Sequence, residues 1–314
     1  MQFEPVVLFF LLGVFAGLVR SDLKIPGSIY EALSIFLLLA IGLQGGVKLA
    51  EFPLVQLLVP ALLILAVGAL IPLLAFPVLR LLGRMTRADS GSIAAHYGSV
   101  SVVTFSVAVA LLMQEDIDFE GYMIVFLVLL EIPALVIGVV LARSGSGSAQ
   151  WGRLAHEVLF GKSILLLAGG LVIGFVAGAE GIKPLDILFF DLFKGILALF
   201  LLEMGLVAAG RIAGLRSYGV FLVSFAILTP LLSAILGTLL GWMLGLSVGG
   251  TMLLATLYAS ASYIAAPAAM RIAVPKANPA LSIGAALGIT FPFNIFLGIP
   301  IYLWMAQFIH SFGA

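Results

Sequence analysis

The sequence of 314 residues is 63% hydrophobic and only 10% charged, with a mean hydropathy of +1.26. Soluble domains carry about 25% charged residues, so we infer that lipid solvates most of this chain. The 15 basic and 15 acidic residues cancel, which leaves no electrostatic case for nucleic acid as a partner. The absence of cysteine excludes disulfides and cysteine-ligated metal or iron–sulfur sites.

Ten apolar segments, separated by Gly, Pro and charged residues, are interpreted as membrane-spanning helices. A helix needs about 20 apolar residues to cross about 30 Å of hydrocarbon. The first segment lacks a basic leader and a clear cleavage site, so we expect a retained helix and not a signal peptide. In chain order the expected spans are 6–20, 28–47, 53–82, 90–113, 121–142, 161–179, 187–210, 217–243, 248–273 and 279–309.

The basic residues fall mainly on one side of these ten spans. Such a bias marks the cytoplasmic side, so we expect a multi-pass protein of the bacterial inner membrane with both termini outside. The acidic turn over 115–120 then also lies outside. The outer side receives Lys48, Lys183 and Lys194, whereas the cytoplasmic side receives Arg20, Lys24, Arg80, Arg84, Arg87, Arg143, Arg153, Lys162, Arg211, Arg216, Arg271 and Lys276.

The two halves of the chain resemble each other, which predicts a first repeat over 1–142, a short Gly/Ser-containing cytoplasmic linker over 143–160 and a second repeat over 161–314. Because each half has five spans, an odd number, the second must be inverted, as in many secondary transporters. Chance similarity between apolar segments is the alternative. The matches are Gly42–Leu43 with Gly205–Leu206, Lys48 with Arg211, Ser99 with Ser262, Glu131 with Asn294, and Gly13/Gly17 with Gly170/Gly174.

The fourth and ninth spans are predicted to be interrupted helices. Each carries small, hydroxylated or proline residues near its middle, over 95–104 and 258–267. Two helices broken at the midplane would direct the N-termini of their second halves, with free N–H groups, toward one point. This arrangement favours an anion site. The alternative is that the small residues only let neighbouring helices approach closely.

Glu131 is a carboxylate in the middle of an apolar span, and such a residue is a functional-site hypothesis. Its repeat partner, Asn294, is an amide. Carboxylate, amide and backbone oxygens suit a hard cation, so these residues are candidates for a sodium site, with Gln44 as a further candidate for cation coupling. A proton carried by Glu131, or a structural hydrogen bond, are the alternatives.

Several motifs resemble the sodium-dependent bicarbonate transporter family: Ile41–Gly46, Glu131–Leu135, Met204–Gly205 and Arg271-x-x-x-Pro275-x-Ala277–Asn278–Pro279. The resemblance covers essentially the whole chain. It implies an all-α membrane protein of ten helices in a five-plus-five inverted repeat, similar to the bile-acid symporter fold. The fourth and ninth helices would cross beside the substrate in a core domain. A gate domain would form a homotrimer, and transport would follow elevator-like alternating access.

The resemblance also implies which residues bind the ions. Family substrate contacts carry over onto Gly98, Ser99, Ser101, Thr104, Ser260 and Ser262, and Tyr263 stands beside them where the family has an acidic residue. The family's Ser-Gly-Ser-Thr motif reads Ser101–Val102–Val103–Thr104 here. Thr104 joins Glu131 and Asn294 as a candidate sodium ligand, and sodium is the expected coupling ion in a protein without other cofactors.

The resulting hypothesis is sodium-coupled uptake of bicarbonate, with no enzymatic activity. Two alternatives keep the fold: a sodium- or proton-coupled symporter of another small organic anion, and an anion sensor that does not transport. The short linker over 143–160 argues against docking of a PII-like regulatory partner there.

Overall fold

The chain is helical throughout the part that the structure describes. This structure is a computed structural model, and it describes residues 5–143, 152, 156, 160–212 and 215–312. These ranges contain no strands, so the expectation of an all-helical protein is confirmed. Most of the linker expected over 143–160 lies outside the described residues.

In the first half of the chain, prolines and a threonine mark where helices begin. Pro26 and Pro53 directly precede helices, and the hydroxyl of Thr86 accepts a hydrogen bond from Asp89 N (3.1 Å) at the start of another. The helices are α1 (Pro5–Leu18), α2 (Gly27–Ala50), α3 (Leu54–Leu81), α4 (Arg87–Gly98), α5 (Val102–Gln114) and α6 (Met123–Arg143).

The second half is less regular, because several π-helical turns and short helices interrupt it. Such turns inside helices often occur at functional sites. The elements are α8 (Lys162–Ile182), η1 (Lys183–Leu185), η2 (Ile187–Asp191), α9 (Phe193–Ile212), α10 (Leu215–Met243), α11 (Val248–Ala259), α12 (Ala265–Ala273), α13 (Pro279–Ala285), η3 (Ala286–Thr290), α14 (Phe291–Phe293), η4 (Asn294–Gly298) and α15 (Ile299–His310).

Eight helical segments in the described ranges are long and apolar enough to cross a membrane. The other two expected spans contain the shorter apolar helices α1 and α11. Many large apolar side chains face outward, including Val55 and Val176, which are 85% and 79% exposed. This surface suits a hydrocarbon solvent.

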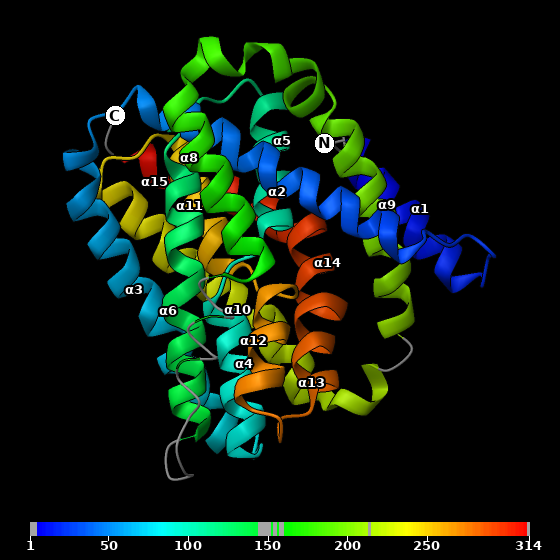
Figure 1. Cartoon of the computed structure of the whole chain (residues 1–314). Coiled ribbons are helices and arrows are strands. Elements are labelled where there is room, and N and C mark those ends of the chain that lie inside the picture. The colour runs from blue at the N-terminus through cyan, green and yellow to red at the C-terminus, as the bar shows by residue number, and fades with distance from the viewer. Residues whose placement is uncertain (1–4, 144–151, 153–155, 157–159, 213–214, 313–314) are drawn as a thin grey trace.

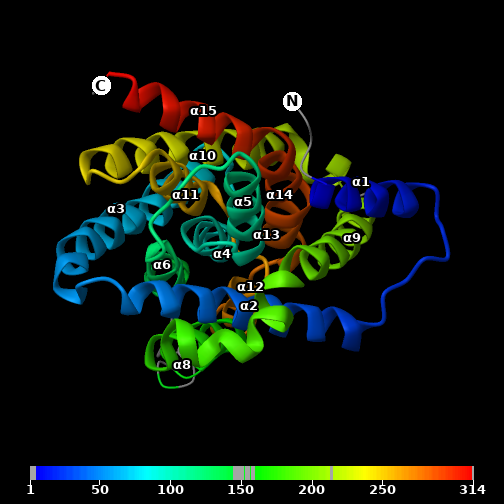
Figure 2. The ribbon, with the colours of Figure 1, turned by 90° about the horizontal axis from the view of Figure 1, so that it is seen from above.

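Two helix pairs approach so closely that their contacts require glycine. Helix α1 lies along α9, and α2 lies along α8, as Figure 2 shows. A Cβ atom on Gly13 would overlap the carbonyl oxygen of Leu202, and one on Gly174 would overlap the carbonyl oxygen of Leu43. Small residues permit such close approach between membrane helices. The two glycine motifs of the sequence repeat therefore act in helix packing.

Helices α4, α5 and α11 form the buried centre of the molecule. In Figure 2, α4 and α5 lie near the middle of the bundle, surrounded by other helices. Every residue of α4 from Ser90 to Gly98 is buried, and so is every residue of α11 from Gly249 to Ala259. In Figure 1, α4 occupies the lower part of the molecule and α5 the upper part.

Two polar contacts join the starts of helices from the two halves of the chain. Asn278, at the start of α13, donates its backbone N–H to Asp89 Oδ1 in the first turn of α4 (2.7 Å). Helices α4 and α13 lie in the lower part of Figure 1. Lys162, at the start of α8, forms an ion pair with Glu31 in α2 (3.1 Å between Nζ and Oε1).

A second set of contacts lies at the opposite end. Ser247, the N-cap of α11, donates its backbone N–H to Glu120 Oε1 (2.6 Å), in the acidic turn before α6. Thr251 Oγ1 and His310 Nε2, at the end of α15, are 3.1 Å apart. The end of α15 therefore lies beside the acidic turn. The membrane orientation itself stays a prediction.

We predict that Gly174→Leu destabilises the folded protein, because the new side chain would overlap the backbone of α2. Overpacking of this kind destabilises by about 1–3 kcal/mol, so the melting temperature in detergent should fall.

The matched control is Gly169→Leu, in the same helix, where an added Cβ meets no atom within 4 Å. Equal melting temperatures for the two variants would contradict the packing argument.

Candidate functional site

The first break, residues 99–101, separates α4 from α5. Gly98 ends α4, and Ser99 and Ser101 adopt extended backbone conformations with ψ angles of 170° and 112°. Helix α5 restarts because the Ser101 hydroxyl accepts a hydrogen bond from Thr104 N (3.2 Å) and acts as its N-cap. The serine that ends the break thus also begins the next helix.

The second break, residues 260–264, separates α11 from α12. Ser260 is extended, with a ψ angle of 165°, and α12 begins at Ala265. The Ser262 hydroxyl accepts a hydrogen bond from Ala266 N in the first turn of α12 (3.2 Å). Pro267 has no N–H group, which suits a position in a first turn where no intrahelical acceptor exists. Both segments predicted to be interrupted are therefore interrupted in the structure.

The two breaks are hydrogen-bonded to each other. Ser101 N donates to Ser260 Oγ (2.9 Å), and Ser262 N donates to His96 O (2.8 Å). All four residues are buried. Non-helical backbone at membrane depth is tolerated only where protein or a water-filled cavity satisfies it. Here each break supplies a hydrogen-bond partner for backbone groups at or next to the other break.

Some hydrogen-bonding groups at the first break remain for another partner. Ser99 is 1% exposed, and its hydroxyl has no hydrogen-bond partner in the described part of the chain. The amides of Val102 and Val103 open α5, where a helix provides no intrahelical acceptor. Hydroxyl and amide donors without a countercharge suit a small anion.

Glu131 lies on α6 beside the first break. It is 2% exposed, and its Oε2 atom has no hydrogen-bond partner among the described residues. One turn further along α6, Ala134 packs against Gly98, since a Cβ on that glycine would lie 2.9 Å from the Ala134 Cβ. A buried carboxylate oxygen without a donor can interact with a cation or carry a proton.

Asn294 lies at the second break, where it has a structural role that its sequence position did not reveal. Its Nδ2 atom donates to Ala259 O, the last carbonyl of α11 (2.9 Å). Its Oδ1 atom accepts a hydrogen bond from the Tyr302 hydroxyl (2.7 Å). Because Oδ1 has two lone pairs, one remains for a further partner.

Thr104 and Tyr263 lie close to Ser101. Thr104 Oγ1 donates to Ser101 Oγ (3.0 Å), which leaves lone pairs on the threonine oxygen. The Tyr263 side chain lies near Ser101 and packs edge-to-face on Phe291, with ring centroids 5.2 Å apart. Its hydroxyl is buried without a hydrogen bond from the described residues.

Gln44 is separate from this group. It lies on α2 and lines a cavity between α2, α5 and the segment before α9. Gly98 is at the break but serves packing, because α3 and α6 leave no room for a side chain there. The other predicted residues belong to one of the two breaks or to a helix beside them.

Sequence reasoning missed two buried tyrosines that brace the breaks. The Tyr97 hydroxyl lies 2.7 Å from Thr290 Oγ1 in η3, and the Tyr258 hydroxyl donates to Ile64 O in α3 (2.6 Å). Each tyrosine comes directly before the residue that ends its half-helix. Their partners lie about 190 residues away, a separation that no local pattern discloses.

The reciprocal hydrogen bonds between the breaks should contribute measurably to stability. In Ser260→Ala the buried N–H of Ser101 would lose its acceptor, and an unsatisfied buried group costs about 1–3 kcal/mol. We expect a lower melting temperature in detergent.

Ser106→Ala is the matched control, because that hydroxyl is equally buried but bonds only to Val102 O of its own helix (2.8 Å). A smaller effect for Ser260→Ala than for Ser106→Ala would contradict the role assigned to the bond between the breaks.

Within the described residues, eight helical segments long and apolar enough to cross a membrane, with polar groups enclosed among them, indicate a multi-pass membrane protein. A family model described as the Na+-dependent bicarbonate transporter superfamily matches residues 5–307. The chain belongs to this superfamily, which implies transport and not catalysis. A comparison with curated proteins found no match.

Proposed function

We propose that this protein is a secondary active transporter that takes up bicarbonate together with sodium. The observation that carries the proposal is the pair of mutually bonded breaks, with the unpartnered hydroxyl of Ser99 between helices that restart there. Family membership supplies the substrate class.

Bicarbonate would bind at the first break. The Ser99 hydroxyl and the amides of Val102 and Val103 are donors, and the positive end of the α5 dipole favours an anion. Bicarbonate is small and planar with three oxygens, so a few donors from one turn would satisfy much of its hydrogen-bonding capacity. Ser101, Ser260 and Ser262 hold the two backbones in place around it.

Sodium would bind beside the anion, between the two breaks. Glu131 offers a buried carboxylate oxygen that lacks a donor, Asn294 offers the free lone pair of its amide oxygen, and Thr104 offers a hydroxyl. The cation would offset the desolvation of the anion, so each ion would promote binding of the other. This reciprocity is the thermodynamic basis of coupled transport.

An inverted repeat and an elevator-like movement complete the proposal. The pairing of α1 with α9 mirrors that of α2 with α8, as a two-fold relation between the halves would require. Helices α1, α2, α8 and α9 pack mainly with one another and would form the gate, with trimer contacts. The remaining helices would move as the core. The bonds from Asp89 to Asn278 and from Glu120 to Ser247 would hold that core together at both ends.

A second candidate keeps the site and changes the cargo. The buried Tyr263 hydroxyl, near Ser101 and without a hydrogen bond, could donate to a further acceptor of a larger organic anion. Glu131 would then carry sodium or a proton. Competition of small carboxylates with labelled bicarbonate distinguishes the two cargoes.

Transport in proteoliposomes tests the main proposal. We expect labelled bicarbonate to accumulate when a sodium gradient is imposed and not when potassium replaces sodium. Uptake that follows a proton gradient instead would support the proton-coupled alternative. Binding of bicarbonate without any uptake would point to a sensor.

Ser99→Ala should raise the KM for bicarbonate without lowering stability. The hydroxyl has no hydrogen-bond partner among the described residues, so the folded protein loses no bond. A hydrogen bond to a charged ligand contributes about 1.5–3 kcal/mol, which corresponds to a KM raised by about tenfold or more.

Ser90→Ala is the matched control, because Ser90 is also buried with an unpartnered hydroxyl but lies more than two turns earlier in α4. Similar KM values for the two variants would remove Ser99 from the substrate site.

Glu131→Gln should remove the dependence of uptake on sodium while the protein still folds, because the amide keeps the size of the side chain but removes its charge and replaces one acceptor oxygen with an NH2 donor. Uptake at several sodium concentrations measures this change. Glu180→Gln is the control, since it makes the same substitution at an exposed carboxylate near the end of α8. Unchanged sodium dependence in Glu131→Gln would exclude this carboxylate as a sodium ligand.

A further inference from the structure

A cavity of about 570 Å³ lies between α2, α5, the acidic turn and the segment around α9. Its walls are mainly apolar, and its polar lining comes from Gln44 and Ser106 inside and from Lys48, Asp116 and Asp118 at the turn. A water molecule occupies about 30 Å³ in the liquid, so the cavity has room for a hydrated ion.

The mouth of the cavity carries charges of both signs. Lys48 is exposed, and its stem packs on Gly121, where a Cβ atom would overlap the lysine Cβ. Its ion pair with Glu51 is long, at 3.9 Å, and exposed, so it contributes little. Asp116 and Asp118 line the same mouth. This mixture of charges would admit either a cation or an anion to the cavity.

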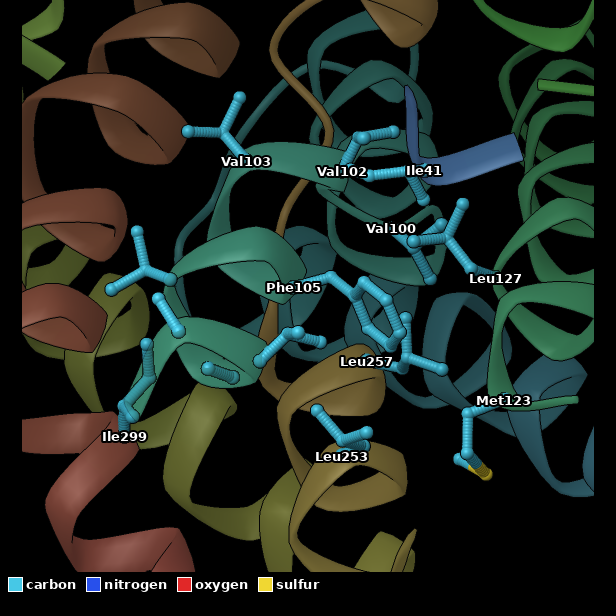
Figure 3. Close-up of a cluster of buried hydrophobic side chains, with 14 of the residues drawn as sticks. Ile41, Val100, Val102, Val103, Phe105, Met123, Leu127, Leu253, Leu257 and Ile299 are labelled. Carbon is cyan, nitrogen blue, oxygen red and sulfur yellow. The ribbon is translucent and has the colours of Figure 1, made fainter. Parts of the chain in front are cut away.

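The inner end of the cavity is lined by Phe105, which lies in α5 one helical turn after the first break. Phe105 and Ile41 line the cavity and are 1% and 3% exposed. The backbone N–H of Phe105 donates to Ser101 O (3.0 Å), which places Phe105 in the first turn of α5. Figure 3 shows the Ile41 and Val102 side chains close together, and the Phe105 ring lies apart from them, next to Leu257.

We propose that this cavity is the outer access vestibule of the transporter, and that Phe105 and Ile41 form the apolar barrier between it and the anion site. The inference rests on the proposed function for its cargo, a small hydrated oxyanion accompanied by a monovalent cation. Both side chains lack donors and acceptors, so an ion that has left its water shell gains nothing from them. Passage therefore requires the barrier to move, as at other hydrophobic constrictions.

Cysteine labelling tests the vestibule, and the chain has no native cysteine to interfere. In intact cells a membrane-impermeant thiol reagent should modify Val47→Cys, which is partly exposed and lines the cavity. It should not modify Leu39→Cys, which is also partly exposed in α2 but lies outside the lining. We expect a rate difference of about tenfold or more, because a residue outside the cavity reacts only after local opening. Equal rates, or labelling of Val47→Cys only in inside-out vesicles, would overturn the proposal.

A second cysteine tests the barrier. Val102 is buried outside the cavity lining, with its side chain next to Ile41, so Val102→Cys should react slowly from outside in sodium-free medium. Adding Phe105→Ala should raise that rate by about tenfold or more, because the position no longer needs a local opening to react. Phe105→Leu, which keeps most of the bulk, should not.

If Phe105→Ala does not fold, Ile41→Ala tests the same barrier, because it removes most of the other side chain. If none of the folded variants that open the barrier accelerates labelling of Val102→Cys, the barrier assignment is wrong. Labelling needs no transport, so these results stand apart from the uptake assay. Sodium-driven uptake with an unlabelled Val47→Cys would refute the vestibule alone, and correct labelling without uptake would refute the cargo alone.

Discussion

A helix that is interrupted inside a membrane exposes backbone groups that lipid cannot satisfy, and this constraint organises the centre of the molecule. The two breaks meet it together, through Ser101 N on Ser260 Oγ and Ser262 N on His96 O. Neither break would be stable alone at that depth, because an unsatisfied backbone group in hydrocarbon costs several kcal/mol. The halves of the chain therefore have to fold against each other for either half to place its broken helix.

The surrounding contacts follow from the same requirement. Asn294 satisfies the last carbonyl of α11, and Tyr97 and Tyr258 tie the ends of the half-helices to η3 and α3. Once these hydrogen bonds are made, few buried polar side-chain atoms of the described residues lack a partner. They include the hydroxyl of Ser99 and one oxygen of Glu131, a donor and an acceptor that neighbour the same break. A site that holds an anion and a cation together needs both kinds of group.

Sequence patterns predicted the two interruptions because small, hydroxylated and proline residues are unusual in the middle of apolar spans. They also predicted membership of the superfamily, through motifs spread along the chain, and the family match confirms it. They were less informative about Gln44 and Asn294. Both are polar residues within apolar spans, yet Gln44 lines a separate cavity and Asn294 forms two structural hydrogen bonds. Polarity in a span shows that a partner is needed but not which partner.

The sequence by itself determined the solvent of this protein, the segments that are apolar helices and the places where two of them break, because hydropathy and local backbone preference act over a few residues. Only the tertiary structure decided which groups remain unpartnered. The acceptors of Ser101 N and Tyr258 come from segments about 160 and 190 residues away. Whether Ser99, Glu131 or Asn294 is free for a ligand depends on such distant neighbours, and no local pattern contains them.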